Sequence, residues 1–505
     1  MPRPTLLLAL ALLAPSVPAQ EGTPNVVLIL ADDLGWGDVR ANNPGSSIPT
    51  PHFDRLAAEG LLFTDAHSPS GVCTPTRYGV LTGRYCWRSR LKSGVLGGYS
   101  TPLLDPGQPT LGTLFQDAGY ATAAVGKWHL GMALPLLSDD VQTTPWAGDP
   151  GIDFAGTISD GPTHHGFDRY FGVTASLDMA PYVYVRDDHF EALPTAQQPG
   201  QRFPDFVRQG PRSIDFRLEN VLDDLAREAV SFIEEAAAGE APFFLYMPLT
   251  APHKPTTPHP HFVGRTELGP YGDFIHQTDW TLGRVLRALD ETGAAANTLV
   301  VVTSDNGSYM YTRDQRPDHV EDEGVQAFRP EHHRANGPWR GTKADVYEAG
   351  HRVPFVVRWP GRVAAGTRSA EPICHVDLYA TFAAAAGLEV VEGAAEDSHD
   401  LSSLLEGAAG ATRGGPVVHH SGNGTFALRD GRWKAIFCTG SGGREQPKGR
   451  PFDGVRLFDM HLDGGETRDL AAEQPEIVER MTAALTELYG GPLPDNRPRA
   501  EGAGD

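Results

Sequence analysis

The sequence predicts an α/β protein whose core is a large mixed, mostly parallel sheet sandwiched by helices, followed by a smaller C-terminal α+β subdomain. Three observations support this. Short, wholly apolar runs recur along the 505-residue chain, amphipathic segments stand between them, and polar clusters follow most of the runs directly. Short apolar runs suit strands buried on both faces, as in parallel sheets. Alternation of such strands with helices favours a sheet covered on both sides.

The elements follow from these patterns in chain order. The apolar runs predict five strands, at residues 25–30, 121–125, 242–249, 298–303 and 353–359. Apolar spacing predicts helices at 54–60, 110–119, 222–238 and 274–289. Ligands in such folds bind beyond the carboxyl ends of the strands. The polar residues that follow the runs are therefore the first candidates for a site.

The C-terminal part has a different character. Residues 391–415 are rich in Ala, Gly and Glu and predict a connection between a catalytic domain at 20–390 and a subdomain at 416–495. Within the subdomain, residues 425–436 predict a hairpin about Asp430-Gly431. A strand at 455–460 and a helix over Pro475–Tyr489 follow. Residues 496–505 are expected to form a disordered tail.

The first 19 residues predict a cleaved secretory signal peptide. They combine one early positive charge, an apolar run at 5–13 and small residues before Gln20. The run is too short to span a bilayer. A membrane anchor and a lipoprotein signal are the alternatives, but no cysteine marks a lipoprotein cleavage point. No other run is long enough to cross a membrane, so a secreted or periplasmic protein without a membrane span is expected.

The net charge of −22 argues against nucleic-acid binding, which favours a basic surface. It does not exclude an anionic substrate, because nearby cationic groups dominate once salt screens distant charges. The chain has no Cys-x-x-Cys motif, and its four cysteines are Cys73, Cys86, Cys374 and Cys438. If Cys73 is modified, two of the other three can pair in an exported protein, and the sequence leaves the pairing open.

Two acidic pairs follow predicted strands. Asp32-Asp33 comes after the first, and Asp305-Asn306 comes after the fourth. Three carboxylates and one amide oxygen form an all-oxygen set that suits Ca²⁺ or Mg²⁺ rather than zinc. Each pair alone is equally typical of a helix cap or a turn.

Four further motifs carry groups able to act on an anion. They are Cys73-Thr74-Pro75-Thr76-Arg77 with Leu81-Thr82-Gly83-Arg84, Gly126-Lys127-Trp128-His129, Pro252-His253-Lys254-Pro255, and Arg340-Gly341-Thr342-Lys343. Lysine supplies positive charge, and histidine titrates near neutrality and can transfer a proton. Taken singly, each motif is also compatible with surface or core residues.

Together these motifs resemble those of the type I sulfatases, the formylglycine-dependent members of the alkaline phosphatase superfamily, such as arylsulfatase A and N-acetylgalactosamine-6-sulfatase. The resemblance runs from Asn25 to about Leu388 and resumes weakly in the C-terminal part. It implies an alkaline-phosphatase-like fold. It also implies that a formylglycine-generating enzyme oxidises Cys73, and that Ca²⁺, or Mg²⁺, binds the residues of the two acidic pairs, namely Asp32, Asp33, Asp305 and Asn306.

The resemblance also implies roles for six residues, namely Cys73, Arg77, Lys127, His129, His253 and Lys343. The hydrated aldehyde at residue 73 would attack the sulfate, while the arginine and the two lysines neutralise its oxygens. His253 would protonate the leaving alcohol. His129 would take a proton from the remaining hydroxyl, which releases sulfate.

The expected function is therefore hydrolysis of sulfate esters. A phosphonate or phosphodiester hydrolase of the same superfamily is one alternative, and a non-catalytic sulfated-glycan binding protein is another, although a pure binder has little need of acid-base groups. Long polar loops at 139–165 and 176–212 favour a sulfated sugar or oligosaccharide as substrate. Candidate sugar contacts in these loops are His164, His165, Asp178, Tyr182, Arg186 and Asp187.

Overall fold

The computed structural model describes residues 22–138, 141, 146, 151–314 and 317–496. The predicted signal peptide at 1–19 lies outside the described residues. So does nearly all of the predicted tail at 496–505.

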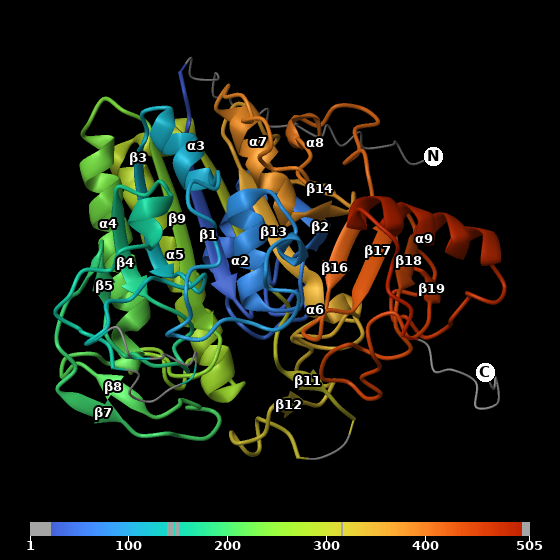
Figure 1. The fold of residues 1–505 in the computed structure, drawn as a ribbon, viewed down its shortest axis with the longest axis horizontal. Coiled ribbons are helices and arrows are strands. Elements are labelled where there is room, and N and C mark those ends of the chain that lie inside the picture. Colours follow the sequence, from blue (N-terminus) through green and yellow to red (C-terminus); the bar gives the residue numbers. More distant parts are fainter. Residues whose placement is uncertain (1–21, 139–140, 142–145, 147–150, 315–316, 497–505) are drawn as a thin grey trace, which may run out of the picture.

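The core is a mixed sheet of eleven strands in the order β14-β2-β13-β10-β1-β9-β3-β4-β5-β6, with β15 also paired to β2 (Figure 1). Its strands are β1 (Asn25–Asp32), β2 (Leu61–His67), β3 (Ala121–Lys127), β4 (Arg169–Val173), β5 (Val185–Arg186), β6 (His189–Phe190), β9 (Phe243–Pro252), β10 (Thr298–Ser304), β13 (Arg352–Arg358), β14 (Thr367–Ser369) and β15 (Ile373–Cys374). The run β10-β1-β9-β3-β4 is parallel, whereas β13 is antiparallel to both of its neighbours. The predicted mixed, mostly parallel sheet is confirmed.

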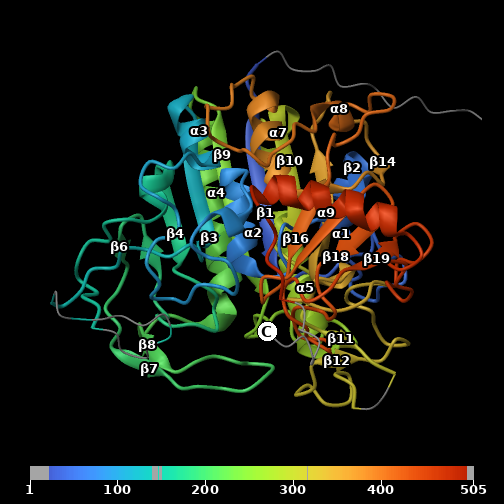
Figure 2. The ribbon, with the colours of Figure 1, turned by 45° about the vertical axis from the view of Figure 1, so that its right-hand side comes forward.

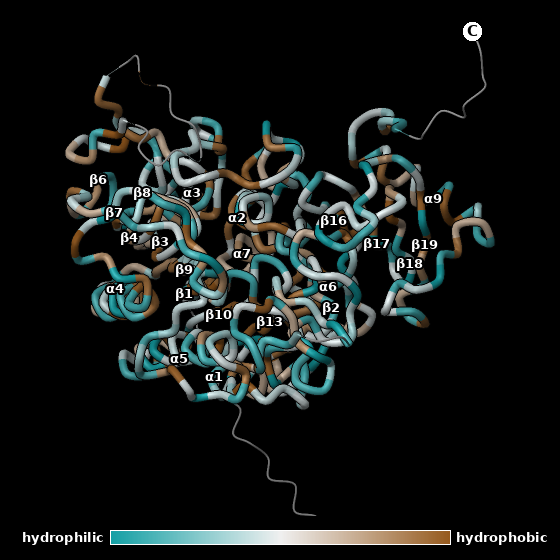
Figure 3. Tube along the Cα trace, turned by 90° about the horizontal axis from the view of Figure 1, so that it is seen from below, coloured by the Kyte–Doolittle hydropathy of each residue, from teal (hydrophilic) through white to brown (hydrophobic). Residues whose placement is uncertain are grey.

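Helices cover both faces of this sheet. Viewed from below, the sheet lies between two helical layers (Figure 3). One layer holds α1 (Pro51–Glu59), α4 (Val221–Ala237) and α5 (Gly269–Thr292), and the other holds α2 (Cys73–Thr82), α3 (Leu111–Asp117) and α7 (Leu378–Ala385). The face of α4 that meets the sheet carries Leu225, Ala229, Phe232 and Ile233, which recur at helical spacing and are buried.

The C-terminal part forms a four-stranded antiparallel sheet, β16 (Val417–His420), β17 (Phe426–Asp430), β18 (Trp433–Ile436) and β19 (Arg456–Asp459). The helix α9 (Pro475–Tyr489) lies across it (Figure 2). The structure therefore contains the predicted hairpin, strand and closing helix. The exact domain boundaries at 390, 415 and 495 stay a prediction.

Short elements complete the fold. Two small ribbons, β7 (Ala196–Gln198) with β8 (Gly210–Arg212) and β11 (Tyr311–Thr312) with β12 (Ala327–Phe328), lie beyond the lower end of the large sheet (Figure 1). The remaining helical pieces are α6 (Glu348–His351), α8 (Ser402–Leu405) and the 3-10 turns Cys86–Arg88, Pro162–His165, Leu218–Asn220, Ala294–Asn297 and His375–Asp377. All four cysteines are buried and unpaired. None of the helices in the described part of the chain is both long and apolar enough to cross a bilayer.

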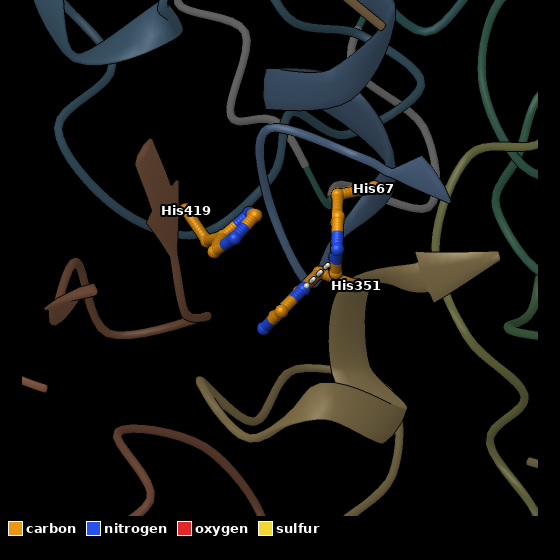
Figure 4. A group of neighbouring side chains, drawn as sticks. All are labelled: His67, His351 and His419. Atoms are coloured by element: carbon orange, nitrogen blue, oxygen red, sulfur yellow. Dashed lines mark hydrogen bonds between the residues drawn. The ribbon is translucent and has the colours of Figure 1, made fainter. Parts of the chain in front are cut away.

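The sequence did not predict β2, because polar residues interrupt its apolar pattern. Asp65 and His67 are nevertheless buried, and they belong to a network between the large sheet and the C-terminal sheet. Three histidines from three elements meet there, His67 from β2, His351 from α6 and His419 from β16 (Figure 4). The rings of His351 and His419 stack, with centroids 3.7 Å apart.

The hydrogen bonds of this network form a directed chain. Lys434 Nζ lies 3.0 Å from His351 Nε2, His351 Nδ1 lies 3.0 Å from His67 Nδ1, and His67 Nε2 lies 2.6 Å from Asp65 Oδ1. If each donor faces the next acceptor, from Lys434 to Asp65, both rings are neutral. His351 Nε2 also lies 3.1 Å from the carbonyl oxygen of Val346, so the cluster is a hydrogen-bonded junction between the two sheets.

Burial lowers the pKa of all three histidines, and Lys434 lowers that of His351 and of His419 further. A histidine whose pKa is lower in the folded than in the unfolded protein has no destabilising effect above its unfolded pKa of about 6.5. Below that pH the unfolded protein takes up the proton more readily, so the free energy of unfolding falls. Glu466, whose pKa burial raises to about 6, opposes this effect, because the folded state takes up its proton more readily. The charged groups around the junction are Asp65, Glu348, Arg352, Arg429, Lys434 and Glu466.

We therefore expect the free energy of unfolding to fall between pH 7 and 5, and the variant His419→Gln to fall less steeply. One histidine accounts for at most about 1.4 kcal/mol per pH unit. Denaturant unfolding at a series of pH values and constant salt measures the two slopes. Identical slopes in the two proteins would show that His419 does not titrate with unfolding.

Candidate active site

The parallel pairing of β1 with β10 brings the two acidic pairs together. The register runs from Asn25 opposite Thr298 to Ala31 opposite Ser304, so both pairs leave the sheet at the same point. Asn306 Nδ2 donates to Asp33 Oδ1 at 2.6 Å, and the backbone N–H of Asp33 donates to Asp305 Oδ1 at 3.2 Å. Asp33 has a positive φ of 65°, which turns the chain sharply at the end of β1. The four residues predicted to hold a metal thus form one buried cluster.

The helix α2 presents Cys73 and Arg77 to this cluster. Cys73 is its first residue, and its Sγ lies 3.6 Å from Asp32 Oδ1 and 3.4 Å from Lys343 Nζ. Arg77 binds Asp305 Oδ2 through Nε and Nη2 at 3.1 and 2.8 Å. Since residues four apart lie on the same face of a helix, the spacing in Cys-x-Pro-x-Arg places both side chains on the acidic cluster.

Two lysines contact the carboxylates of the acidic cluster. Lys127, the last residue of β3, reaches Asp32 Oδ2 at 2.6 Å, and Lys343 reaches Asp33 Oδ1 at 2.6 Å. Both lysines are almost fully buried. Burial alone would lower the pKa of Lys343, but Asp33 and the other nearby acidic groups outweigh it and raise that pKa. Together with Arg77, these two lysines place three cationic side chains against the three carboxylates of the site.

The two predicted histidines have different hydrogen-bond partners. His253 Nδ1 lies 2.5 Å from the Lys254 carbonyl oxygen and 3.1 Å from Ser176 Oγ, and its Nε2 lies 3.6 Å from Asp33 Oδ2. His129 Nε2 lies 2.8 Å from the carbonyl of Leu96, while its Nδ1 is buried without a partner among the described residues. Burial, followed by the nearby lysines, lowers the pKa of both imidazoles well below the usual value.

The acidic cluster has the features of a cation site. Burial and the neighbouring Asp305 raise the pKa of Asp32 to about 7. Within the described part of the chain, Asp33 Oδ2 and Asn306 Oδ1 are buried without hydrogen-bond partners. Unpaired buried acceptors cost free energy, which a bound cation removes. The oxygen-rich donor set fits a hard divalent ion such as Ca²⁺ or Mg²⁺.

The predicted sugar contacts fall into two groups. Asp178 lies near Lys254, is buried and pairs with Arg208, and its Oδ1 has no partner among the described residues. Tyr182 donates to the carbonyl of Arg208. The others are engaged away from the cluster or exposed: His165 pairs with Asp160, Arg186 pairs with Glu191 and Glu228, Asp187 accepts from the Tyr170 N–H, and His164 is exposed.

Sequence reasoning missed Ser176. Its hydroxyl lies 3.3 Å from Lys127 Nζ and 3.1 Å from His253 Nδ1, so it connects the two groups. It follows β4, where the rule that polar residues after a strand form the site would have found it. However, β4 begins with Arg169 and contains Gly172, so it does not form a wholly apolar run.

The fold and this cluster define a hydrolase of anionic esters, and comparison with known proteins gives the family. The family model described as Sulfatase matches residues 24–388. The chain belongs to the sulfatase family and is a sulfuric ester hydrolase. The predicted resemblance to type I sulfatases is confirmed.

Several curated relatives match nearly the whole chain. An N-acetylgalactosamine-6-O-sulfatase of Bacteroides thetaiotaomicron is 33% identical over 92% of this chain and 93% of its own length. The mouse steryl-sulfatase is 31% identical over 96% and 86%. The human N-acetylgalactosamine-6-sulfatase is 29% identical over 92% and 85%.

Solved structures of other proteins share the fold of this chain. One from work on the metabolism of multiple glycosaminoglycans by Bacteroides thetaiotaomicron is 31% identical, covers 93% of this chain and 99% of its own, and superposes with a TM-score of 0.79. A phosphonate monoester hydrolase of Agrobacterium radiobacter shares the fold with a TM-score of 0.58 at 19% identity, over 92% and 95% of the two chains.

If the acidic cluster binds a divalent ion, Ca²⁺ should stabilise the chelator-treated protein. Binding to the folded state alone adds about 2.7 kcal/mol at 100 times the dissociation constant. We expect Asp33→Asn to lose this response. The matched control is Asp273→Asn, which alters a buried carboxylate that binds the backbone of residues 264 and 266 in another part of the fold.

Melting temperature with and without Ca²⁺ or Mg²⁺ measures this response and shows which ion is preferred. A melting temperature that is insensitive to both ions in the parent protein would rule out the site. An equal response in Asp33→Asn and the parent would rule out this ligand set.

Proposed function

We propose that this sulfatase is an exported enzyme that removes sulfate from sulfated carbohydrates, using a formylglycine derived from Cys73 and a divalent cation. The observation that carries the proposal is the position of Cys73, at the start of α2 and within reach of both Asp32 and Lys343. Export is supported by the signal-like residues 1–19. Ca²⁺ is the first candidate ion and Mg²⁺ the second, held by Asp32, Asp33, Asp305 and Asn306.

The cysteine itself is a poor nucleophile. Burial raises the pKa of the Cys73 thiol to about 12, so the thiol keeps its proton at neutral pH. Oxidation by a formylglycine-generating enzyme would supply, as the hydrated aldehyde, one hydroxyl to attack sulfur and a second to release the product. Because Cys73 is 2% exposed, that oxidation has to precede folding.

The charges of the site favour an anion. Three carboxylates balance Arg77, Lys127 and Lys343, so a bound divalent cation would leave a net charge of about +2 and withdraw electron density from the sulfate oxygens. Lys127 and Lys343 are held in place by ion pairs, and their positive charge is therefore arranged before substrate binds.

The hydrogen bonds support different proton transfers for the two histidines. With Nδ1 donating to the Lys254 carbonyl, His253 presents Nε2 and can carry a proton there for the leaving alcohol oxygen. The negative charge of a bound sulfate ester raises the pKa of this imidazole and favours that form. With Nε2 donating to the Leu96 carbonyl, His129 presents Nδ1, which has no partner among the described residues and can accept a proton from the side chain of residue 73.

A sugar fits the surroundings of the site better than a sterol. Relatives of similar identity are named for N-acetylgalactosamine 6-sulfate and for steryl sulfate, so identity alone does not decide. Asp178, Arg208 and Lys254 make the surroundings of His253 polar and charged. Asp178 Oδ1 can accept a bond from a sugar hydroxyl. We therefore propose 6-sulfated N-acetylgalactosamine as the first substrate to test.

The alternatives have less support. No observation favours phosphonate or phosphodiester hydrolysis, because the similarity to the phosphonate hydrolase extends to the fold alone. A sulfated-glycan binding protein without turnover would not need the buried acid-base pair His129 and His253. Desulfation of a panel of sulfated hexosamines, steryl sulfate, an aryl sulfate and a phosphonate monoester by the matured enzyme tests these choices together.

Maturation is tested by co-expression with a formylglycine-generating enzyme. We expect peptide mass spectrometry to find an aldehyde at residue 73, activity to scale with the converted fraction, and Cys73→Ala to be inactive. Cys438→Ala, a buried cysteine in the C-terminal part, is the control that should keep the modification. Full activity from unmodified Cys73 would refute the formylglycine mechanism.

Substrates with different leaving groups distinguish the roles of the two histidines. Proton transfer by a positioned side chain typically contributes about 10²–10⁴-fold. His253→Ala should lose this factor on a sugar sulfate and much less on an aryl sulfate, whose leaving group needs no proton. His129→Ala should accumulate covalent sulfate on residue 73, detectable by intact-protein mass spectrometry. Equal losses on both substrates for His253→Ala, without an adduct in His129→Ala, would contradict the assignment.

A further inference from the structure

Lys254 is a cation beside the site that no acidic group neutralises. It directly follows His253, and its ammonium lies 5.0 Å from the ring centroid of Phe206 and 6.0 Å from that of Tyr309. Among the described residues, none of the ion pairs within 4.0 Å involves Lys254. Contacts with aromatic faces compensate only part of the cost of its partial burial.

Two other cations act electrostatically on this amine. Burial, then Arg444 and then Lys343 lower the pKa of Lys254 to about 8. The two carboxylates that act in the opposite direction are already paired, Asp33 with Lys343 and Asp178 with Arg208. Arg208 also lies over Phe206, with its guanidinium carbon 5.3 Å from the ring centroid, so two cations share this ring.

Arg444 comes from the C-terminal part, in the connection between β18 and β19. The backbone N–H of Arg444 donates to Asp345 Oδ1 at 2.5 Å. Asp345 lies two residues after Lys343, so this bond holds the connection against the loop that carries Lys343. Among the described residues, the guanidinium of Arg444 has no hydrogen bond or ion pair. Around Lys254, the cations Lys343, Arg208 and Arg444 therefore outnumber the carboxylates Asp33 and Asp178, and both carboxylates are already ion-paired.

We propose that Lys254 and Arg444 bind a second anionic group of the substrate, a carboxylate or a second sulfate, beside the sugar whose sulfate ester is hydrolysed. The inference rests on the proposed function and narrows its substrate to polyanionic carbohydrates. A singly sulfated sugar places its one charge beside Lys127 and Lys343 and leaves the outer cations unpaired. A second anion pairs them in a partly buried place, where screening by salt is weaker than in solution.

The test compares three substrates of the matured enzyme. 6-Sulfated N-acetylgalactosamine carries one anionic group, its disaccharide with a uronic acid adds a carboxylate, and 4,6-disulfated N-acetylgalactosamine adds a sulfate. We expect kcat/KM to be at least about tenfold higher on one or both of the doubly charged substrates, a difference of about 1.4 kcal/mol. Raising the ionic strength should reduce this preference.

Lys254→Met and Arg444→Met should each reduce the ratio of kcat/KM for doubly to singly charged substrate by about tenfold, mainly through KM, and Lys254→Arg should retain it. Lys448→Met is the matched control, because it removes one charge from an exposed position on the same connection and should leave the ratio unchanged. Using a ratio makes the result independent of any general loss of active enzyme.

Each outcome has one meaning. Loss of the ratio for the uronic acid disaccharide alone identifies a carboxylate site, and loss for the disulfated sugar alone identifies a second sulfate site. Ratios unchanged in both variants overturn this inference while leaving sugar sulfatase activity intact. If the parent enzyme hydrolyses aryl or steryl sulfates but none of the three sugars, the proposed substrate class is wrong, and this inference is wrong with it.

Discussion

The pairing of β1 with β10 is the constraint on which the site depends. In a parallel pair both carboxyl ends reach the same edge, so Asp32-Asp33 and Asp305-Asn306 leave the sheet side by side although 272 positions separate Asp33 from Asp305. Three buried carboxylates at one point would repel one another. The fold therefore has to bring Arg77, Lys127 and Lys343 to the same place, and they come from α2, the end of β3 and the loop before α6.

The ion pairs of this arrangement hold the cations of the site in place. A buried ion pair contributes little net stability, yet removing one partner leaves an uncompensated charge at a cost of about 3–5 kcal/mol. Each lysine is thus fixed by the carboxylate that it neutralises. Positive charge held in this way needs no rearrangement when a sulfate arrives, which is the condition for electrostatic stabilisation of a transition state.

The C-terminal part contributes more than a cover for the sheet. Through His419 and Lys434 it completes a buried hydrogen-bonded junction with β2 and α6. Through Arg444 it adds a positive charge that acts on Lys254. β18 carries Lys434, and the connection that follows β18 carries Arg444, whose backbone N–H donates to Asp345 Oδ1.

The sequence by itself determined the fold class, the family and the ten residues proposed for the site, because short apolar runs and motifs such as Cys-x-Pro-x-Arg are local signals. It did not predict β2, because the buried residues Asp65 and His67 give this strand the pattern of a polar segment. It also left Arg444 without a role, since nothing near position 444 indicates contact with the loop that follows Lys343. Only the tertiary structure decided these points, because burial of charge is tolerated where distant residues supply its partners, and such partners cannot be read from neighbouring sequence.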